Sequence, residues 1–261
     1  MTYKAVFLDI DGTILRSDHT YESSTREAIQ QAKKNNIEVF LATGRPLHEI
    51  TDLAKDLDIH SLIGYNGAYA IYQDKTIVNE PMQKDIVEAF YDKTKNHGHE
   101  MIIYTNKKNY LSSLHTPIMK HFTKTFNLTQ NEIIHTGVFY NILGGSLINL
   151  PDEEKDLYQF TQDIYLSPVT VSGMQNCYDL IRKNVNKGNA VETVLHTMGI
   201  APEQAIAFGD GMNDKEMLQT VGEGIAMGNA HPDLLQYAKH QTTPVNEDGI
   251  FNGLKQLGVI S

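Results

Sequence analysis

The sequence predicts an α/β protein whose parallel-sheet core is interrupted by an inserted α/β domain. Short, continuously apolar runs alternate with amphipathic helical stretches at the start of the chain, and the same alternation returns after Asn184. Such alternation is typical of parallel strands joined by crossover helices. Between Pro81 and Asn184 the apolar residues of the expected strands are less continuous, which indicates a separate sheet with one open face. We therefore expect a core formed by 1–81 and 185–261 and an inserted domain at 82–184.

The first part of the core is expected to run strand, helix, strand, helix. The opening run YKAVFLD has the length and continuity of a strand that is buried on both faces. In the helix that follows, Ser24 and Glu27 have capping-box spacing. In the second helix, Pro46 falls near the first turn. The expected elements are a strand at 3–9, a helix at 23–36, a strand at 37–44 and a helix at 45–59.

The inserted domain and the second part of the core are each expected to mix helices with strands. In the insert, KDIVEAFYDKTKN is a predicted helix, and EMIIYT, VTVSG and CYDLIRK are predicted strands. These segments span 84–96, 100–105, 169–173 and 177–183. The core then resumes with a helix at 188–199, a strand at 205–210, a helix at 214–221, a short strand at 223–228 and a helix at 231–238.

Composition and charge limit the class of protein. The 261 residues carry a formal net charge of −10, which argues against a nucleic-acid backbone or an anionic membrane as partner but allows a small anionic ligand. The single cysteine, Cys177, cannot form an internal disulfide, which suits a reducing compartment. The N-terminal apolar run is too short for a signal peptide, and no run approaches the roughly 20 apolar residues of a membrane span. We expect a cytoplasmic protein; its oligomeric state is left open, with a monomer favoured.

Polar residues that suit phosphate chemistry lie at four junctions between expected elements. DIDGT follows the first strand, ATGR ends the second, NKGNAV opens a helix, and FGDGMND lies between a strand and a helix. Ligands of parallel α/β sheets bind beyond the carboxyl ends of the strands, so we expect these segments to meet. Together they supply Asp9, Asp11, Gly12, Thr13, Thr43, Gly44, Lys187, Asp210, Asn213 and Asp214.

This set of side chains points to a magnesium and phosphate site. Mg²⁺ prefers carboxylate oxygens, and phosphoryl groups are bound by Lys, hydroxyls and backbone N–H groups at turns. Taken singly, each segment has a plainer interpretation: Asp-x-Asp as a solvated turn, Lys187 as a surface lysine and Asp214 as a helix N-cap. An EF-hand loop is excluded, because Thr13 and Ile14 stand where it needs Asp or Asn and then Gly. No zinc spacing, Walker loop or Gly-x-Ser-x-Gly motif occurs in the sequence.

Jointly and in this order, DIDGT, ATGR, NKG and GDGMND resemble the motifs of the haloacid dehalogenase (HAD) superfamily of phosphatases. The resemblance covers essentially the whole chain. The insert between the second and third motifs resembles the cap of the Cof-type branch of sugar- and metabolite-phosphate phosphatases, and Asn66 in YNGAY falls where that branch has an Asn-Gly-Ala segment. The resemblance implies a Rossmann-like HAD core with an inserted α/β cap that selects the substrate.

The resemblance also implies a role for each motif residue. Asp9 would attack phosphorus to form an aspartyl-phosphate, and Asp11 would protonate the leaving group and then activate water. Mg²⁺ would be held by the carboxylates of Asp9 and Asp210 and by the backbone carbonyl of Asp11, with Asp214 as further acidic support. The phosphoryl oxygens would be held by Thr43, Gly44, Lys187 and Asn213, and Gly12, Arg45 and Asn66 are further candidates on the substrate side.

The implied activity is Mg²⁺-dependent hydrolysis of small phosphorylated metabolites such as sugar phosphates. A phosphotransferase or phosphomutase that uses the same aspartyl-phosphate is one alternative, and a non-catalytic protein that binds phosphorylated metabolites is another. Asp11 separates this chain from the related ion-pumping ATPases, which carry Thr at that place. The sequence does not identify the metabolite; Tyr104, Tyr140 and His115 in the expected cap are candidates for contacts with the leaving group.

Overall fold

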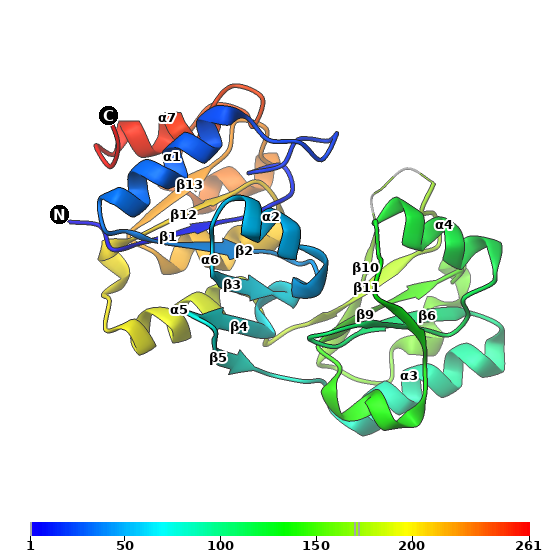
Figure 1. Cartoon of the computed structure of the whole chain (residues 1–261). Coiled ribbons are helices and arrows are strands. Elements are labelled where there is room, and N and C mark those ends of the chain that lie inside the picture. Colours follow the sequence, from blue (N-terminus) through cyan, green and yellow to red (C-terminus); the bar gives the residue numbers. More distant parts are fainter. Residues whose placement is uncertain (1, 170, 172) are drawn as a thin grey trace. The chain divides into compact units, whose positions relative to one another are not determined.

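The computed structural model describes residues 2–169, 171 and 173–261, and the contacts between them divide the chain into two compact units. Unit 1 comprises Met1–Arg45, Thr51–Asn79 and Val185–Ser261, and unit 2 comprises Pro46–Ile50 and Glu80–Asn184. Figure 1 shows both units with most of their helices and strands labelled. Among the described residues, no helix combines the length and the apolar character that a membrane crossing requires.

Unit 1 is built on an eight-stranded sheet with a parallel centre. Its central strand pairs in parallel with neighbours on both sides, as continuously apolar strands predict. At one edge the last three strands pair antiparallel. In sheet order the strands are β14 (His240–Gln241), β13 (Glu223–Ala226), β12 (Ala205–Gly209), β1 (Ala5–Leu8), β2 (Glu38–Ala42), β3 (Ser61–Gly64), β4 (Tyr69–Tyr72) and β5 (Lys75–Asn79).

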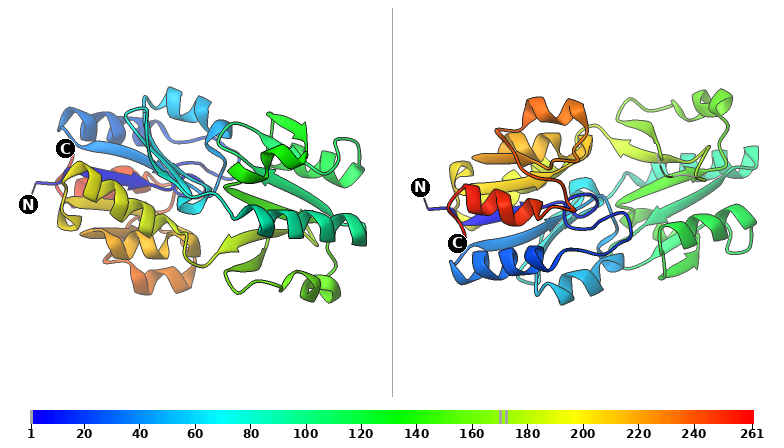
Figure 2. Two further views of the ribbon diagram at one scale, coloured as in Figure 1. Left: turned by 90° about the horizontal axis from the view of Figure 1, so that it is seen from below. Right: turned by 90° about the horizontal axis from the view of Figure 1, so that it is seen from above.

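Helices cover both faces of this sheet, which confirms the expected α/β class (Figure 2). On one face, Ala5 and Phe7 of the central strand pack in a single apolar cluster with Val191 and Val194 of one helix and Met217 of another. In the opposite view, α1 and α7 lie side by side over the other face. The helices of unit 1 are α1 (Ser23–Lys34), α2 (Thr51–Asp56), α5 (Lys187–Met198), α6 (Lys215–Thr220) and α7 (Gly249–Gln256).

Unit 2 has its own six-stranded sheet, with one helix packed on each face. Val87 and Phe90 of the longer helix join the larger apolar cluster, and Met119 and Phe122 of the shorter helix join the smaller one. In sheet order the strands are β10 (Ile164–Pro168), β11 (Tyr178–Arg182), β9 (Gly144–Ile148), β6 (Glu100–Tyr104), β7 (Asn109–Leu111) and β8 (Asn131–Ile133), and the helices are α3 (Lys84–His97) and α4 (Pro117–Thr125).

Short 3₁₀-helices occur in both units, and some of them replace or interrupt expected helices. The helix expected at 45–59 is split, because Glu49 accepts hydrogen bonds from Asn109 and Thr129 within unit 2 instead of continuing a regular helix. The segment expected as a helix at 231–238 is a 3₁₀-helix as well. The 3₁₀-helices of the described residues are Leu47–Glu49, Tyr65–Gly67, Thr136–Asn141, Asp152–Tyr158, Pro202–Gln204, Met212–Asp214 and Pro232–Tyr237.

Two local predictions are wrong, and the three strands at 61–79 were not predicted. The capping box does not form: α1 has Glu22 at its N-cap, and the Ser24 hydroxyl donates to Asp248 instead. The strand of this part of unit 2 is Ile164–Pro168, so the described residues of 169–173 are not a strand. Thr170 and Ser172 of that predicted strand lie outside the described residues.

Candidate active site

The carboxyl edge of the unit 1 sheet gathers most of the residues that the sequence singles out. Asp9 follows β1, Thr43 follows β2 and Asp210 follows β12, and these three strands run parallel. Lys187 is the first residue of α5, whose N-cap Asn186 accepts a hydrogen bond from the Asn189 backbone. Parallel strands end at one edge, so side chains that are far apart in the sequence come together there.

Lys187 joins two of the carboxylates. Its side chain is fully buried, and Nζ lies 2.6 Å from Oδ1 of Asp9 and 2.6 Å from Oδ1 of Asp214. Asp9 is itself only 5% exposed and Asp214 is fully buried. A buried ammonium of this kind is held by its partners, because breaking such a pair leaves an uncompensated charge away from water.

Asp214 also shapes the turn that precedes it. Its Oδ2 accepts hydrogen bonds from the backbone N–H groups of Asp210 and Gly211, each at 3.0 Å. Both oxygens of Asp214 are therefore engaged, one by Lys187 and the other by the turn. The consequence is that Asp210, directly after β12, is held at the edge of the sheet with its own carboxylate left for other partners.

Negative charge exceeds positive charge in this cluster. Burial and the neighbouring carboxylate of Asp214 raise the pKa of Asp9 well above its ordinary value. The same two causes raise the pKa of Asp210 to about 7. Burial alone would lower the pKa of Lys187, but Asp214 and Asp9 outweigh burial and raise it. The lysine therefore stays charged, and the carboxylates around it are short of positive charge.

The donor set fits a hard divalent cation. One carboxylate oxygen from each of Asp9, Asp210 and Asp214 lies within 4.8 Å of the others. Asp9 uses Oδ1 for Lys187, and its Oδ2 accepts no hydrogen bond from any residue that the structure describes. From the described part of the chain, the Asp210 carboxylate accepts only long hydrogen bonds, 3.4 Å from the Thr13 hydroxyl and 3.5 Å from Nδ2 of Asn229. Asp9 and Asp210 thus retain oxygens for an oxygen-preferring cation such as Mg²⁺.

The side chain of Asp11 lies outside this carboxylate cluster. It is about half exposed, and Arg45 donates to both of its oxygens, from Nε at 2.7 Å and from Nη2 at 2.5 Å. Two parallel hydrogen bonds of this kind fix the orientation of a carboxylate. Of the four aspartates that the sequence predicts near the metal, Asp11 therefore contributes no side-chain oxygen to the cluster.

Several small or polar residues complete the edge. Gly12 has φ +82°, and a Cβ there would overlap the carboxylate of Asp210, so only glycine allows this approach. Thr43 is buried, and its hydroxyl accepts a hydrogen bond from the Arg45 backbone at 3.1 Å. A Cβ on Gly44 would lie 3.0 Å from Oδ1 of Asn66. That same Oδ1 accepts a hydrogen bond from the side chain of Asn213 at 3.1 Å.

Asn229 belongs to this edge and was not predicted. Its Nδ2 donates to the backbone carbonyl of Gly12 at 2.8 Å, and its Oδ1 accepts a hydrogen bond from the backbone N–H of Val245 at 2.8 Å. One exposed amide thus ties the turn after Asp9 to a loop near the end of the chain. The sequence pattern indicates this position, because Asn229 lies shortly after the strand Glu223–Ala226, just as the motif residues follow their own strands.

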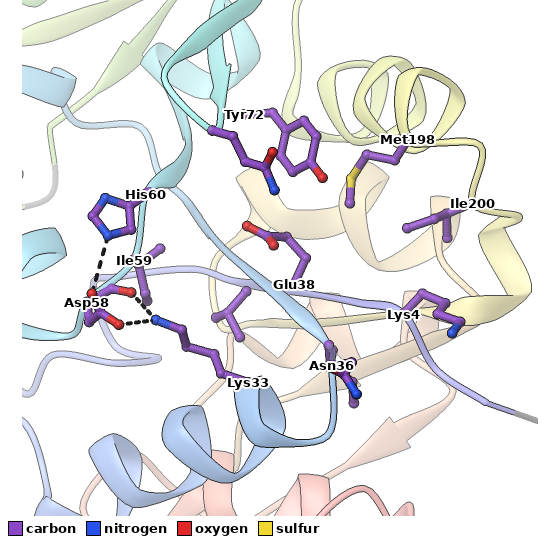
Figure 3. A pocket seen from close by; sticks show the side chains of 13 residues that line it. Lys4, Lys33, Asn36, Glu38, Asp58, Ile59, His60, Tyr72, Met198 and Ile200 are labelled. Carbon is purple, nitrogen blue, oxygen red and sulfur yellow. Dashed lines mark hydrogen bonds and ion pairs between the residues drawn. The ribbon is translucent and has the colours of Figure 1, made fainter.

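A separate pocket of about 550 Å³ lies at the opposite, amino edge of the unit 1 sheet (Figure 3). Lys4 and His60, which line it, stand just before β1 and β3. Lys33 forms an ion pair with Asp58, His60 approaches Asp58 at 3.2 Å, and Glu38 accepts a hydrogen bond from Ser61. These charged groups balance one another, so the pocket lacks the charge imbalance of the carboxyl edge.

Comparisons with known proteins agree with this geometry. Residues 6–254 match the family model described as haloacid dehalogenase-like hydrolase. The putative phosphatase YkrA of Bacillus subtilis is 28% identical over 265 residues, which span all of both chains. A hypothetical protein from Geobacillus kaustophilus HTA426 superposes with a TM-score of 0.90 at 28% identity, over 99% of this chain and 100% of that one. The HAD subclass IIB sugar phosphatase BT4131 superposes with a TM-score of 0.84 at 27% identity, over 98% and 100%.

The matched family region contains every edge segment described above, from the turn after β1 to the loop after β12. The relatives and the solved structures extend over essentially the whole chain, so the likeness includes unit 2 as well as unit 1. The chain belongs to the haloacid dehalogenase-like hydrolase family.

Proposed function

We propose that the protein is a Mg²⁺-dependent phosphatase that hydrolyses small phosphorylated metabolites through an aspartyl-phosphate on Asp9. The observation that carries the proposal is the buried Lys187, which bridges Asp9 and Asp214 beside Asp210 at the carboxyl edge of a parallel sheet. The relatives add support, because one is named a putative phosphatase and a structural neighbour is a sugar phosphatase.

In the proposed reaction, an oxygen of Asp9 attacks phosphorus, and the bond from phosphorus to the leaving oxygen breaks. Asp11 gives a proton to that oxygen, so the product leaves as an alcohol. Asp11 then takes a proton from water, the water oxygen attacks phosphorus, and the bond to Asp9 breaks to release inorganic phosphate and restore the carboxylate. Asp11 must leave Arg45 to do this, and Arg45 is then free to contact the substrate.

The other residues of the edge would hold charge. Asp9 and Asp210, with the backbone carbonyl of Asp11, would hold Mg²⁺, which would supply positive charge against the phosphoryl oxygens. Lys187 supplies a second positive charge and keeps Asp9 oriented. The hydroxyl of Thr43 and the amide of Asn213, with the backbone at Gly44, complete the set of donors for the phosphoryl group.

Unit 2 is proposed to be the cap that selects the leaving group. The proposed boundaries, 82–184 for the cap with 1–81 and 185–261 for the core, differ from the compact units only at 80–81 and at 46–50. Of the cap candidates, Tyr104 is half-buried beside Ser146, whereas Tyr140 is 63% exposed and His115 is exposed as well. The acidic net charge and the single buried Cys177 support a cytoplasmic enzyme that acts on small molecules rather than nucleic acid.

The test is phosphate release from a panel of sugar phosphates, nucleoside monophosphates, pyridoxal phosphate and flavin precursors. Each substrate is assayed with Mg²⁺ and with a chelator, and the Asp9→Asn variant serves as the matched inactive control. Release that needs Mg²⁺ and fails in the variant supports the proposal. Phosphate that passes to a second metabolite instead of water would indicate a phosphotransferase or mutase, and binding without any turnover would indicate a non-catalytic protein.

A further inference from the structure

Two adjacent non-glycine residues at the carboxyl edge adopt a conformation that side chains disfavour. Tyr65 and Asn66, directly after β3, have φ values of +54° and +52°, and Gly67 follows with +99°. Non-glycine residues in this left-handed region are uncommon, and they persist where the surrounding structure fixes them, often at functional sites. We therefore expect contacts with neighbouring segments to hold Tyr65–Gly67 in this conformation.

Its backbone is fixed from two sides. The Asn66 N–H donates to the carbonyl of Thr43 at 3.1 Å, and the Tyr65 N–H donates to the carbonyl of Arg45 at 3.2 Å. On the other side, a Cβ on Gly67 would overlap the backbone carbonyl of Asn186, the N-cap of α5. The segment is thus wedged between the loop that carries Thr43 and the start of the helix that carries Lys187.

The side chain of Asn66 then reaches a third phosphate-side residue. Its Oδ1 accepts a hydrogen bond from Nδ2 of Asn213, while Oδ1 of Asn213 faces Gly211, where a Cβ would lie only 2.6 Å from it. The NH₂ group of the Asn213 amide therefore points to Asn66, and its carbonyl oxygen points to Gly211. The NH₂ group has two hydrogens, so one can bond Asn66 while the other remains for a further acceptor.

We propose that Asn66 is a positioning residue, which turns the amide of Asn213 so that its NH₂ group, and not its carbonyl oxygen, is presented to the phosphoryl group. This inference rests on the proposed function, in which Asn213 binds a phosphoryl oxygen. Asn213 is exposed, and the last torsion of an Asn side chain is broad and roughly two-fold. Without the Asn66 acceptor, the amide turns over freely and spends part of its time with an oxygen lone pair against an anionic phosphoryl oxygen.

The variant that isolates this contact is Asn66→Gly. Glycine accepts the left-handed backbone at this position, so the change removes the acceptor while leaving the segment unstrained. Asn66→Ala would add backbone strain and confuse the two effects. Asn36→Gly is the matched control, because Asn36 has φ +59° and lies at the amino edge of the sheet, beside the pocket of Figure 3.

The first measurement follows the side-chain amide resonances of Asn213 in phosphate-free protein by NMR, with assignment by their loss in Asn213→Ala. We expect them to shift in Asn66→Gly and to stay unchanged in Asn36→Gly. The second measures kcat/KM and the dissociation constant of inorganic phosphate. Asn66→Gly is expected to lower kcat/KM about tenfold and to raise the dissociation constant of phosphate about tenfold. A tenfold change is the size expected for one hydrogen bond made to a charged group.

The decisive comparison is the double variant. In an Asn213→Ala background, Asn66→Gly is expected to cost nothing further, because its effect passes through Asn213. Losses that multiply in the double variant, or an Asn66→Gly protein identical to wild type, would overturn the inference. If wild type releases no phosphate from any ester, the proposed function fails by itself. The Asn213 resonances then decide the remaining point: a shift in Asn66→Gly supports the positioning contact, and unchanged resonances refute it.

Discussion

The two edges of the unit 1 sheet carry similar side chains but opposite electrostatics. At the amino edge, Lys33 and His60 face Asp58, and lysine and histidine hydrogen bonds lower the pKa of that carboxyl. At the carboxyl edge, burial and neighbouring carboxylates raise the pKa of Asp9 and bring that of Asp210 to about 7. The comparison teaches that the surroundings stabilise the ionised form of an aspartate at the amino edge. At the carboxyl edge they disfavour the ionised form, and a bound cation would compensate for this.

The largest expected effect comes from removing the carboxylate that is proposed to attack phosphorus. Asp9→Asn keeps the size of the side chain but removes the proposed nucleophile, so phosphate release should fall by about 10⁴-fold or more. Asp58→Asn is the control at the amino edge, since Asn tolerates the left-handed φ of +55° there. It should leave the rate unchanged. An Asp9→Asn enzyme with wild-type turnover would remove Asp9 from the chemistry.

The next effect concerns Asp11. Asp11→Asn removes the proposed proton donor and acceptor, and the rate should fall by about 10²–10⁴-fold, the usual contribution of a general acid and base. Because its side chain points to Arg45 and not into the carboxylate cluster, Mg²⁺ affinity measured by titration calorimetry should be retained. A variant that loses Mg²⁺ binding together with activity would place the Asp11 side chain on the metal instead.

Replacing the lysine at each edge of the sheet compares how much the two lysines contribute to the stability of the protein. Lys187→Met leaves Asp9 and Asp214 buried without their cation and should lower the free energy of unfolding by about 3–5 kcal/mol at pH 7. Lys33→Met at the amino edge breaks an exposed ion pair and should cause no measurable change. Urea unfolding of both variants measures the change in the free energy of unfolding. Equal losses would mean that burial does not distinguish the two edges.

The smallest effect is a pH dependence of the metal-free protein. The folded-state pKa of Asp210, about 7, lies above its ordinary value of 3.8, so the folded protein binds more protons than the unfolded chain between these values. Stability should therefore fall as pH rises from 4 to 7, by about 1–3 kcal/mol. The lowered pKa of Asp58 acts in the opposite sense, with its contribution lost as pH falls below 4.

Urea midpoints across this range, with chelator and with Mg²⁺, test that dependence. Saturating Mg²⁺ should flatten the profile, because the cation replaces the proton on the carboxylates. Asp210→Asn should flatten the metal-free profile as well. A metal-free protein whose stability does not change between pH 4 and 7 would show that the carboxyl edge relieves its charge in another way.

The sequence predicted the location of the candidate site better than its internal contacts. Asp9, Thr43 and Asp210 could be placed together because each follows an apolar parallel strand, and the carboxyl ends of such strands share one edge. The pair of Asp11 with Arg45 could not be predicted, since it joins two loops whose conformations depend on the folded chain. Asn229 directly follows the strand expected at 223–228, so the rule that places the other residues at this edge applies to it as well.

The fold was predictable where local and tertiary preferences agree. The continuous apolar run of β1 and the amphipathic pattern of α1 gave the correct element types. The helix expected at 45–59 failed, because the hydrogen bonds that Glu49 receives from distant residues outweigh the local helical pattern. The strands at 61–79 were not predicted, because the segment Tyr65–Gly67 interrupts them with residues in the left-handed conformation. The spacing of apolar residues along the sequence does not indicate such a conformation.

The order of the strands in unit 1 has a consequence for biosynthesis. Ala5 of β1 pairs with Ala205 of β12, 200 positions further along the chain, whereas the sheet of unit 2 lies within Glu80–Asn184. On the ribosome, unit 2 has all its strands before β12, one of the two partners of β1, has been synthesised. We expect the insert to fold first, while β1 waits with one edge unpaired and open to association with other chains. Lys187 and Asp210 also emerge late, so the candidate site cannot assemble in a nascent chain until synthesis of the core is nearly finished.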